Sequence, residues 1–180
     1  MTTLAQISLQ VGGVLTALSV PALLATERWQ ASLRAFPRSV AAGWLLSAVD
    51  LVWVGWIMYN GQLAWFNPYK IWLSIIAPAA IVILNLFMEE LLAARALGGL
   101  LLLLAHPMLN AARWHEAESA LLVKLLAYAF VVAGMFLVLA PYEFRRYFAW
   151  WMTSPGRFRA GSAALLLLGL ALVGLSVTVY

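Results

Sequence analysis

The chain has 180 residues, of which 65% are hydrophobic and only 10% are charged, and its net charge is +4. Soluble domains carry about 25% charged residues, so this composition excludes an ordinary water-soluble fold, whereas a lipid bilayer can solvate apolar side chains. The sequence contains no cysteine, which excludes disulfides, zinc–thiolate sites, iron–sulfur clusters and cysteine nucleophiles.

Six apolar segments approach the length of about 20 residues that a helix needs to cross a bilayer core. They cover residues 4–25, 40–59, 71–88, 96–112, 119–141 and 160–180. The first ten residues contain no Lys or Arg, so we interpret the first segment as a helix and not as a secretory signal. We therefore predict an all-α, polytopic transmembrane helical bundle of about six helices, with residues 1–180 forming one integral membrane domain.

The basic residues predict how such a bundle is oriented. Lys and Arg concentrate in cytoplasmic loops. With six helices, eight basic residues fall on one side, and only Lys70, Arg113 and Lys124 fall on the other. The eight are Arg28, Arg34, Arg38, Arg95, Arg145, Arg146, Arg157 and Arg159. This asymmetry predicts that both termini lie outside the cytoplasm, and a compact, Arg-biased chain without a eukaryotic targeting tail favours a bacterial inner membrane. The short basic loops do not favour nucleic acid as a partner.

The segment 143–159 is predicted to lie on the membrane surface. It interleaves Arg145, Arg146, Arg157 and Arg159 with aromatic residues and is broken at Ser154-Pro155-Gly156. This pattern predicts an amphipathic helix followed by a turn, with the four arginines contacting lipid head groups. A shorter version of the pattern occurs over residues 27–38, which indicates either a weak repeat of helical hairpins or convergent loop chemistry.

Asp50 is the clearest candidate for a functional residue within the membrane, where an ionisable side chain costs about 3 kcal/mol. Gly43, Ser47 and Asp50 share one helix face, so we expect Asp50 to face the bundle. At about 1.5 Å per residue, Asp50 and His106 reach similar depths, roughly 15 Å from the inner face. Tyr128 reaches that level from the other side. We expect these three residues to form either a ligand- or proton-binding layer, or a polar contact that only stabilises helix packing.

Two further sites have weaker patterns. Asn85, Glu89, Glu90 and Arg95 form a secondary cluster, in which paired carboxylates could bind a cation or act as acid and base, although a salt-bridged corner at the interface explains them as well. His106 could ligate haem or a chlorophyll-type pigment, but one histidine does not identify a cofactor, which is left unknown. No metal site and no catalytic residue are predicted.

These observations leave three functional hypotheses. The first is a non-catalytic accessory or structural subunit, or a small-molecule binding module, of a membrane complex, whose partners are the bilayer, other membrane subunits or a second copy of the chain. The second is a small proton-coupled transporter or channel with a midplane Asp/His site. The third is a membrane-embedded lipid-modifying enzyme. The small supply of buried polar groups favours the first hypothesis.

Overall fold

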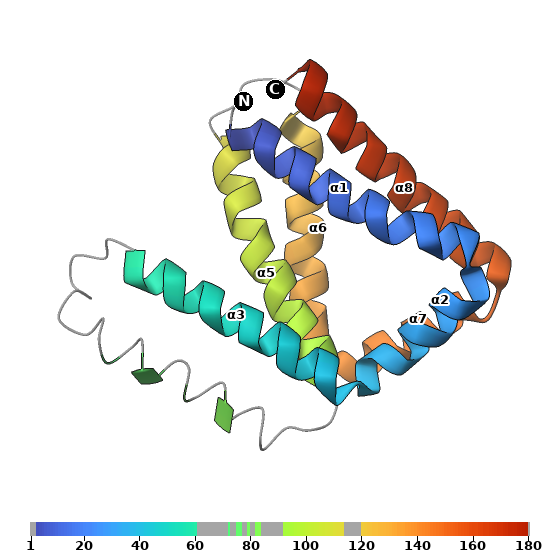
Figure 1. Cartoon of the computed structure of the whole chain (residues 1–180), viewed down its shortest axis with the longest axis horizontal. Helices are drawn as coiled ribbons and strands as arrows, with labels where there is room; N and C mark the ends of the chain where they lie inside the picture. The colour runs from blue at the N-terminus through green and yellow to red at the C-terminus, as the bar shows by residue number, and fades with distance from the viewer. Residues whose placement is uncertain are drawn as a thin grey trace.

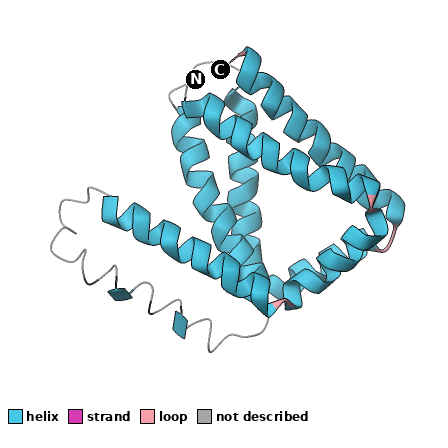
Figure 2. Cartoon of the chain, viewed as in Figure 1, coloured by secondary structure: helices cyan, strands magenta, loops and turns pink. Residues whose placement is uncertain are grey.

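The computed structural model describes residues 3–60, 92–113 and 120–179, together with Trp72, Ile75, Ile76, Ala79, Val82 and Ile83. The side chains of Arg38, Tyr59, Phe144 and Arg145 are not described. Within these ranges the regular elements are helices and there is no β-strand, so the predicted all-α class is confirmed (Figure 2).

Five described helices are long and apolar enough to cross a membrane, which is compatible with an integral membrane protein. They are α1 (Thr3–Leu24), α3 (Val40–Asn60), α5 (Leu92–Arg113), α6 (Ala120–Leu139) and α8 (Pro155–Thr178). The helix expected over residues 71–88 lies outside the described residues, except for the six residues named above, which are helical.

Four of these helices form two antiparallel pairs, α1 with α8 and α5 with α6 (Figure 1). A glycine from each helix lies at each crossing. A Cβ atom added to Gly12 would lie 2.8 Å from the carbonyl oxygen of Gly169, and one added to Gly98 would lie 2.9 Å from that of Gly134. Because no side chain fits at this separation, glycine is what allows the two backbones to approach so closely.

Helix α3 packs against α5 in a parallel orientation. Gly43 lies against Leu92 and Ala93, and Asp50, seven residues later, lies against Gly99. Since the contacts advance in the same direction along both helices, α3 and α5 begin at the same end of the pair. The C-terminal end of α3 therefore lies away from the start of α5.

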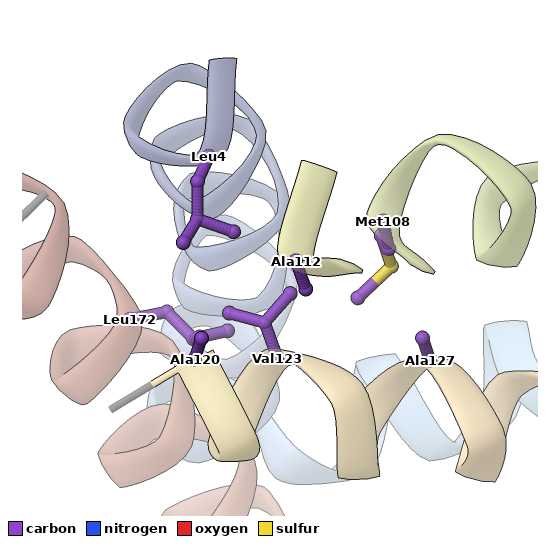
Figure 3. Packing of buried hydrophobic residues seen from close by; sticks show 7 residues of the cluster. All are labelled: Leu4, Met108, Ala112, Ala120, Val123, Ala127 and Leu172. Atoms are coloured by element: carbon purple, nitrogen blue, oxygen red, sulfur yellow. The ribbon is translucent and has the colours of Figure 1, made fainter. Parts of the chain in front are cut away.

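The two helix pairs converge at the end of the molecule where the chain begins and ends (Figure 1). Side chains from α1, α5, α6 and α8 form the main buried cluster there, and Figure 3 shows them pointing toward one another. The cluster consists of Leu4, Met108, Ala112, Ala120, Val123, Ala127 and Leu172. Its small alanines and large aliphatic side chains interlock, which fixes how the four helices meet.

Two short helices join the pairs at the opposite end: α2 (Thr26–Ala35), followed by the 3-10 turn η1 (Phe36–Arg38), and α7 (Pro141–Met152) (Figure 1). A second apolar cluster holds them against α1 and α8. It contains Ala22, Met152 and Phe158, packed by Trp29, Leu33 and Phe148. Both short helices are amphipathic, with their apolar faces toward this cluster and their arginines outside it.

The surface segment expected over residues 143–159 is divided differently in the structure. Its helix, α7, ends at Met152, and Ser154 is extended, with φ −116° and ψ 121°. Helix α8 then begins at Pro155 instead of residue 160. Proline is favoured in the first turn of a helix and disfavours a helical conformation in the residue before it, so Pro155 sets this boundary.

Candidate membrane-embedded binding site

Asp50 lies on the face of α3 that meets α5. Gly43 and Ser47 of the same face are buried, and Asp50 is half-buried. The Oδ2 atom of Asp50 lies 2.8 Å from the position that a Cβ atom of Gly99 would occupy. The glycine in α5 therefore leaves the space that the carboxyl group of α3 fills.

The second carboxyl oxygen of Asp50, Oδ1, is buried and has no hydrogen-bond partner among the described residues. A buried polar atom without a partner costs about 1–3 kcal/mol, and an acidic side chain at the centre of a membrane helix costs about 3 kcal/mol. A donor from a ligand or another helix would recover much of this cost. Asp50 is thus a strong acceptor site held within an apolar surface.

A cavity of about 560 Å³ lies at the short helices. Another, largely apolar cavity of about 470 Å³ has a lining residue one helical turn away from Asp50, and Asp50 itself is not among its lining residues. This apolar cavity is bounded mainly by α1 and α5, with one side chain each from α3 and α6. Trp53, one helical turn after Asp50, and Leu100, next to Gly99, both line it. Its volume is in the range of small-molecule sites, about 300–1,000 Å³. An apolar ligand in this cavity would meet Asp50 only if its hydrogen-bond donor reached about one helical turn beyond Trp53 and Leu100.

The structure does not bring His106 or Tyr128 to Asp50. His106 lies seven residues beyond Gly99 on α5, which is about 10 Å along the helix axis, and its side chain is exposed. Tyr128 on α6 is 60% exposed. The predicted depths assumed that α5 begins at Ala96, but α5 already includes Leu92, which moves His106 away from the level of Asp50 toward the far end of the helix.

The secondary cluster is described only at Arg95, which is half-buried within α5 and not in a loop. Asn85, Glu89 and Glu90 lie outside the described residues, so their grouping stays a prediction. Within the described part of the chain, no three His, Asp or Glu side chains gather where they could hold a metal ion. Ligation of haem or a pigment by His106 also stays a prediction.

The arginines expected at lipid head groups lie at the end of the molecule formed by α2, α7 and the start of α8. Arg146 pairs with Glu143 at 3.5 Å, and the guanidinium of Arg157 lies 4.5 Å from the centre of the Trp150 ring. Arg159 donates a hydrogen bond from Nε to Thr26 Oγ1 at 3.4 Å, which joins α8 to α2. The side chain of Arg145 is not described.

Arg34 has a role in this region that the sequence pattern did not reveal. Its Nη2 atom donates to the carbonyl oxygen of Met152 at 3.1 Å. The carbonyls of the last turn of a helix have no partner within the helix, and they carry partial negative charge, so a guanidinium is well suited to satisfy one of them. Arg34 thereby joins the C-terminal end of α2 to that of α7.

No protein-family model matches the chain, and no curated protein or solved structure matches it either.

Proposed function

We propose that the chain is a non-catalytic integral membrane subunit that works as a binding module, with Asp50 and the neighbouring apolar cavity as its binding site. The ligand is either an apolar small molecule with a hydrogen-bond donor or a polar side chain from another membrane subunit or a second copy. In both cases the binding energy comes from burying apolar surface and from giving a donor to the carboxyl group of Asp50.

One observation carries this proposal: the buried Oδ1 atom of Asp50, which no described residue satisfies. A buried carboxyl group that only stabilised helix packing would be expected to have its hydrogen bonds made by its neighbours. Here the neighbouring position on α5 is Gly99, which offers space but no side-chain donor. No described residue supplies the donor, and we assign it to a bound group.

The test compares the molecules that co-purify with the wild-type protein in mild detergent with those that co-purify with its variants. The wild-type protein is expected to retain a stoichiometric small molecule or partner subunit, identified by mass spectrometry. Asp50→Ala removes the acceptor, and Leu100→Trp fills the cavity while Asp50 is kept. Asp50→Ala is expected to reduce retention roughly tenfold, the equivalent of losing one charged hydrogen bond of about 1.4 kcal/mol. Leu100→Trp is expected to reduce retention of a small molecule because the larger side chain takes up the space that the molecule would fill.

The matched control is Leu121→Trp, because Leu121 is exposed on α6 and does not line the cavity. This variant should retain the bound species as the wild type does. Full retention by both Asp50→Ala and Leu100→Trp would contradict the proposal, as would a wild-type protein that is stable and pure with nothing bound.

A proton-coupled transporter is the second candidate, and the same carboxyl group favours it, because acidic residues near the middle of a membrane mark proton and ion pathways in carriers. Asp50→Asn keeps the shape of the side chain but cannot release a proton. In proteoliposomes loaded with a pH-sensitive dye, a transporter would move protons with its substrate, and this variant would lose that coupling. Ligand retention without any flux would support the binding module instead. The third hypothesis, a lipid-modifying enzyme, would use Glu89, Glu90 or the layer predicted around Asp50.

We propose that α2 and α7 face the cytoplasm of a bacterium and that both termini lie on the outer side of its inner membrane. The positive-inside rule supports this orientation, because the arginines of α2, α7 and the start of α8 lie at the end opposite the termini (Figure 1). The natural absence of cysteine allows single-cysteine labelling with a membrane-impermeant maleimide. In whole cells, Thr3→Cys should react and Ser32→Cys should not; the reverse result would contradict the orientation.

A further inference from the structure

A second cavity, separate from Asp50, lies where α2 and η1 meet α7. Its volume is about 560 Å³, which suits a small ligand or a lipid head group. Three polar side chains line it: Arg34 from α2, and Tyr142 and Arg146 from α7. Two guanidinium groups and a hydroxyl on the same cavity favour an anion, and arginine pairs especially well with the oxygens of a phosphate group.

Both arginines keep hydrogen-bonding capacity for such an anion. A guanidinium has five N–H donors, and Arg34 uses Nη2 to bind the Met152 carbonyl. Arg146 pairs with Glu143 at 3.5 Å, but its side chain is 70% exposed, so this ion pair contributes little and can rearrange. Glu143 itself does not line the cavity.

A separate apolar cavity of about 240 Å³ adjoins this one on the side of α1 and α8. Leu33, Phe148 and Met152 line both cavities. The lining of the second cavity also includes Leu18 and Leu165 from the two long helices. A charged compartment and a hydrocarbon compartment therefore share one wall, at the end of the bundle where the amphipathic helices lie.

We propose that this pair of cavities binds one phospholipid with an anionic head group. The phosphate lies between Arg34 and Arg146, and an acyl chain lies along Leu33, Phe148 and Met152. A soluble phosphate would need only the charged compartment, whereas the adjoining apolar compartment is explained by a chain attached to the anion. Basic residues next to membrane helices attract anionic lipids by about 1 kcal/mol each, which adds to the specific contacts.

The test measures lipid retention by native mass spectrometry after reconstitution with a mixture of phosphatidylglycerol and phosphatidylcholine. Wild-type protein is expected to keep one phosphatidylglycerol in preference to phosphatidylcholine. Arg146→Gln is expected to lower that retention about tenfold, as the loss of a charge-assisted hydrogen bond would. Ala149→Trp fills the charged compartment without changing charge, since Ala149 lines it, and should lower retention comparably. Arg34→Gln provides a third variant if either protein fails to fold.

Arg28→Gln is the matched control. It removes one positive charge, as Arg146→Gln does, but Arg28 lies on α2 and lines a different cavity. It should retain the lipid to within about twofold, the size expected of a surface charge. An equal loss of lipid retention in Arg28→Gln and Arg146→Gln would overturn the proposal, because it would show that general surface charge, and not a discrete site, holds the lipid. Unchanged retention in the folded Arg146→Gln and Ala149→Trp proteins would also overturn it. Displacement of the lipid by millimolar inorganic phosphate would instead identify a soluble anion as the ligand.

Discussion

In each of the two antiparallel helix pairs, the two helices cross at the same kind of contact. In α1/α8, the position of a Cβ on Gly12 meets the Gly169 carbonyl, Leu172 and Val173. In α5/α6, the same position on Gly98 meets the Gly134 carbonyl, and then Leu137 and Val138, which have the same spacing from the partner glycine. One packing arrangement thus occurs twice in the molecule.

The resemblance extends along α1 and α5 themselves. Each helix has a Gly-Gly pair with a proline nine positions after its first glycine, namely Gly12-Gly13 with Pro21 and Gly98-Gly99 with Pro107. Residues at equivalent positions are also buried alike: Ser8 and Ala94, Gly12 and Gly98, Ser19 and Ala105, and Ala22 and Met108. Since α1 and α5 run in opposite directions, the same arrangement of glycines, proline and buried positions occurs in helices of opposite orientation.

The pairs differ at the second glycine. A Cβ added to Gly13 would meet nothing within 4 Å, whereas one added to Gly99 would meet the carboxyl group of Asp50. The first glycine of each pair serves helix packing. The comparison indicates that the second one acquires a role only in α5, where a third helix brings an acidic side chain against it.

The largest predicted effect comes from breaking a crossing. Gly98→Val places methyl groups against the backbone of Gly134, which is only 2.9 Å from the added Cβ. Overpacking costs up to about 3 kcal/mol, and the backbone atom cannot move aside as a flexible side chain can. Thermal unfolding in detergent, followed by circular dichroism, should show a loss of about this size.

Gly12→Val tests whether the crossings are equivalent, because its added Cβ would lie 2.8 Å from the Gly169 oxygen. The two variants should lose similar amounts of stability, each up to about 3 kcal/mol. A Gly12→Val protein as stable as the wild type would show that the shared contacts do not have shared energies.

Gly99→Ala is expected to have the second-largest effect, about 1.5 kcal/mol, which is toward the lower end of overpacking costs. The new methyl group meets only the end of the Asp50 side chain, which can move partly aside but then leaves its place beside α5. The double variant Gly99→Ala/Asp50→Ala separates this clash from any change in α5 itself. If the carboxyl group causes the loss, the single-variant costs will not add, and the coupling should be at least about 0.5 kcal/mol. Additive costs would show that Asp50 does not depend on Gly99.

The sequence predicted the helices better than their relative positions. Apolar segment length is a local property, so the starts of α1 and α3 were predicted to within one residue. The spacing of Gly43, Ser47 and Asp50 likewise indicated the face that meets α5. The partner of Asp50 was not predicted, because depth depends on where each helix begins, and an error of four residues in α5 shifts a side chain by about 6 Å. The matching Gly-Gly and proline positions were the available signal for the two crossings.

Arg34→Gln is expected to have a smaller effect, about 1 kcal/mol, because it removes one hydrogen bond from a charged donor to the Met152 carbonyl. This contact joins α2 and α7 at the end of the molecule opposite the termini, and it involves no residue of the α5/α6 crossing. Hydrogen exchange should therefore increase in α2 and α7 while α5 and α6 keep their protection. Equal loss of protection in both pairs would show that they unfold as one unit.

Gly13→Ala is predicted to have the smallest effect and gives the sharpest contrast with Gly99→Ala. The change is the same, and both glycines follow the crossing glycine of their helix, but the space beside Gly13 is empty to 4 Å. Alanine is the better helix former by up to about 1 kcal/mol in water, and this gain is smaller where a membrane already favours helix, so we expect stability to stay within about 0.5 kcal/mol of the wild type or to rise. The same thermal unfolding experiment measures it. A loss in Gly13→Ala as large as that in Gly99→Ala would mean that the second glycine supports the helix itself in both pairs, and Asp50 would then no longer explain the difference between α1 and α5.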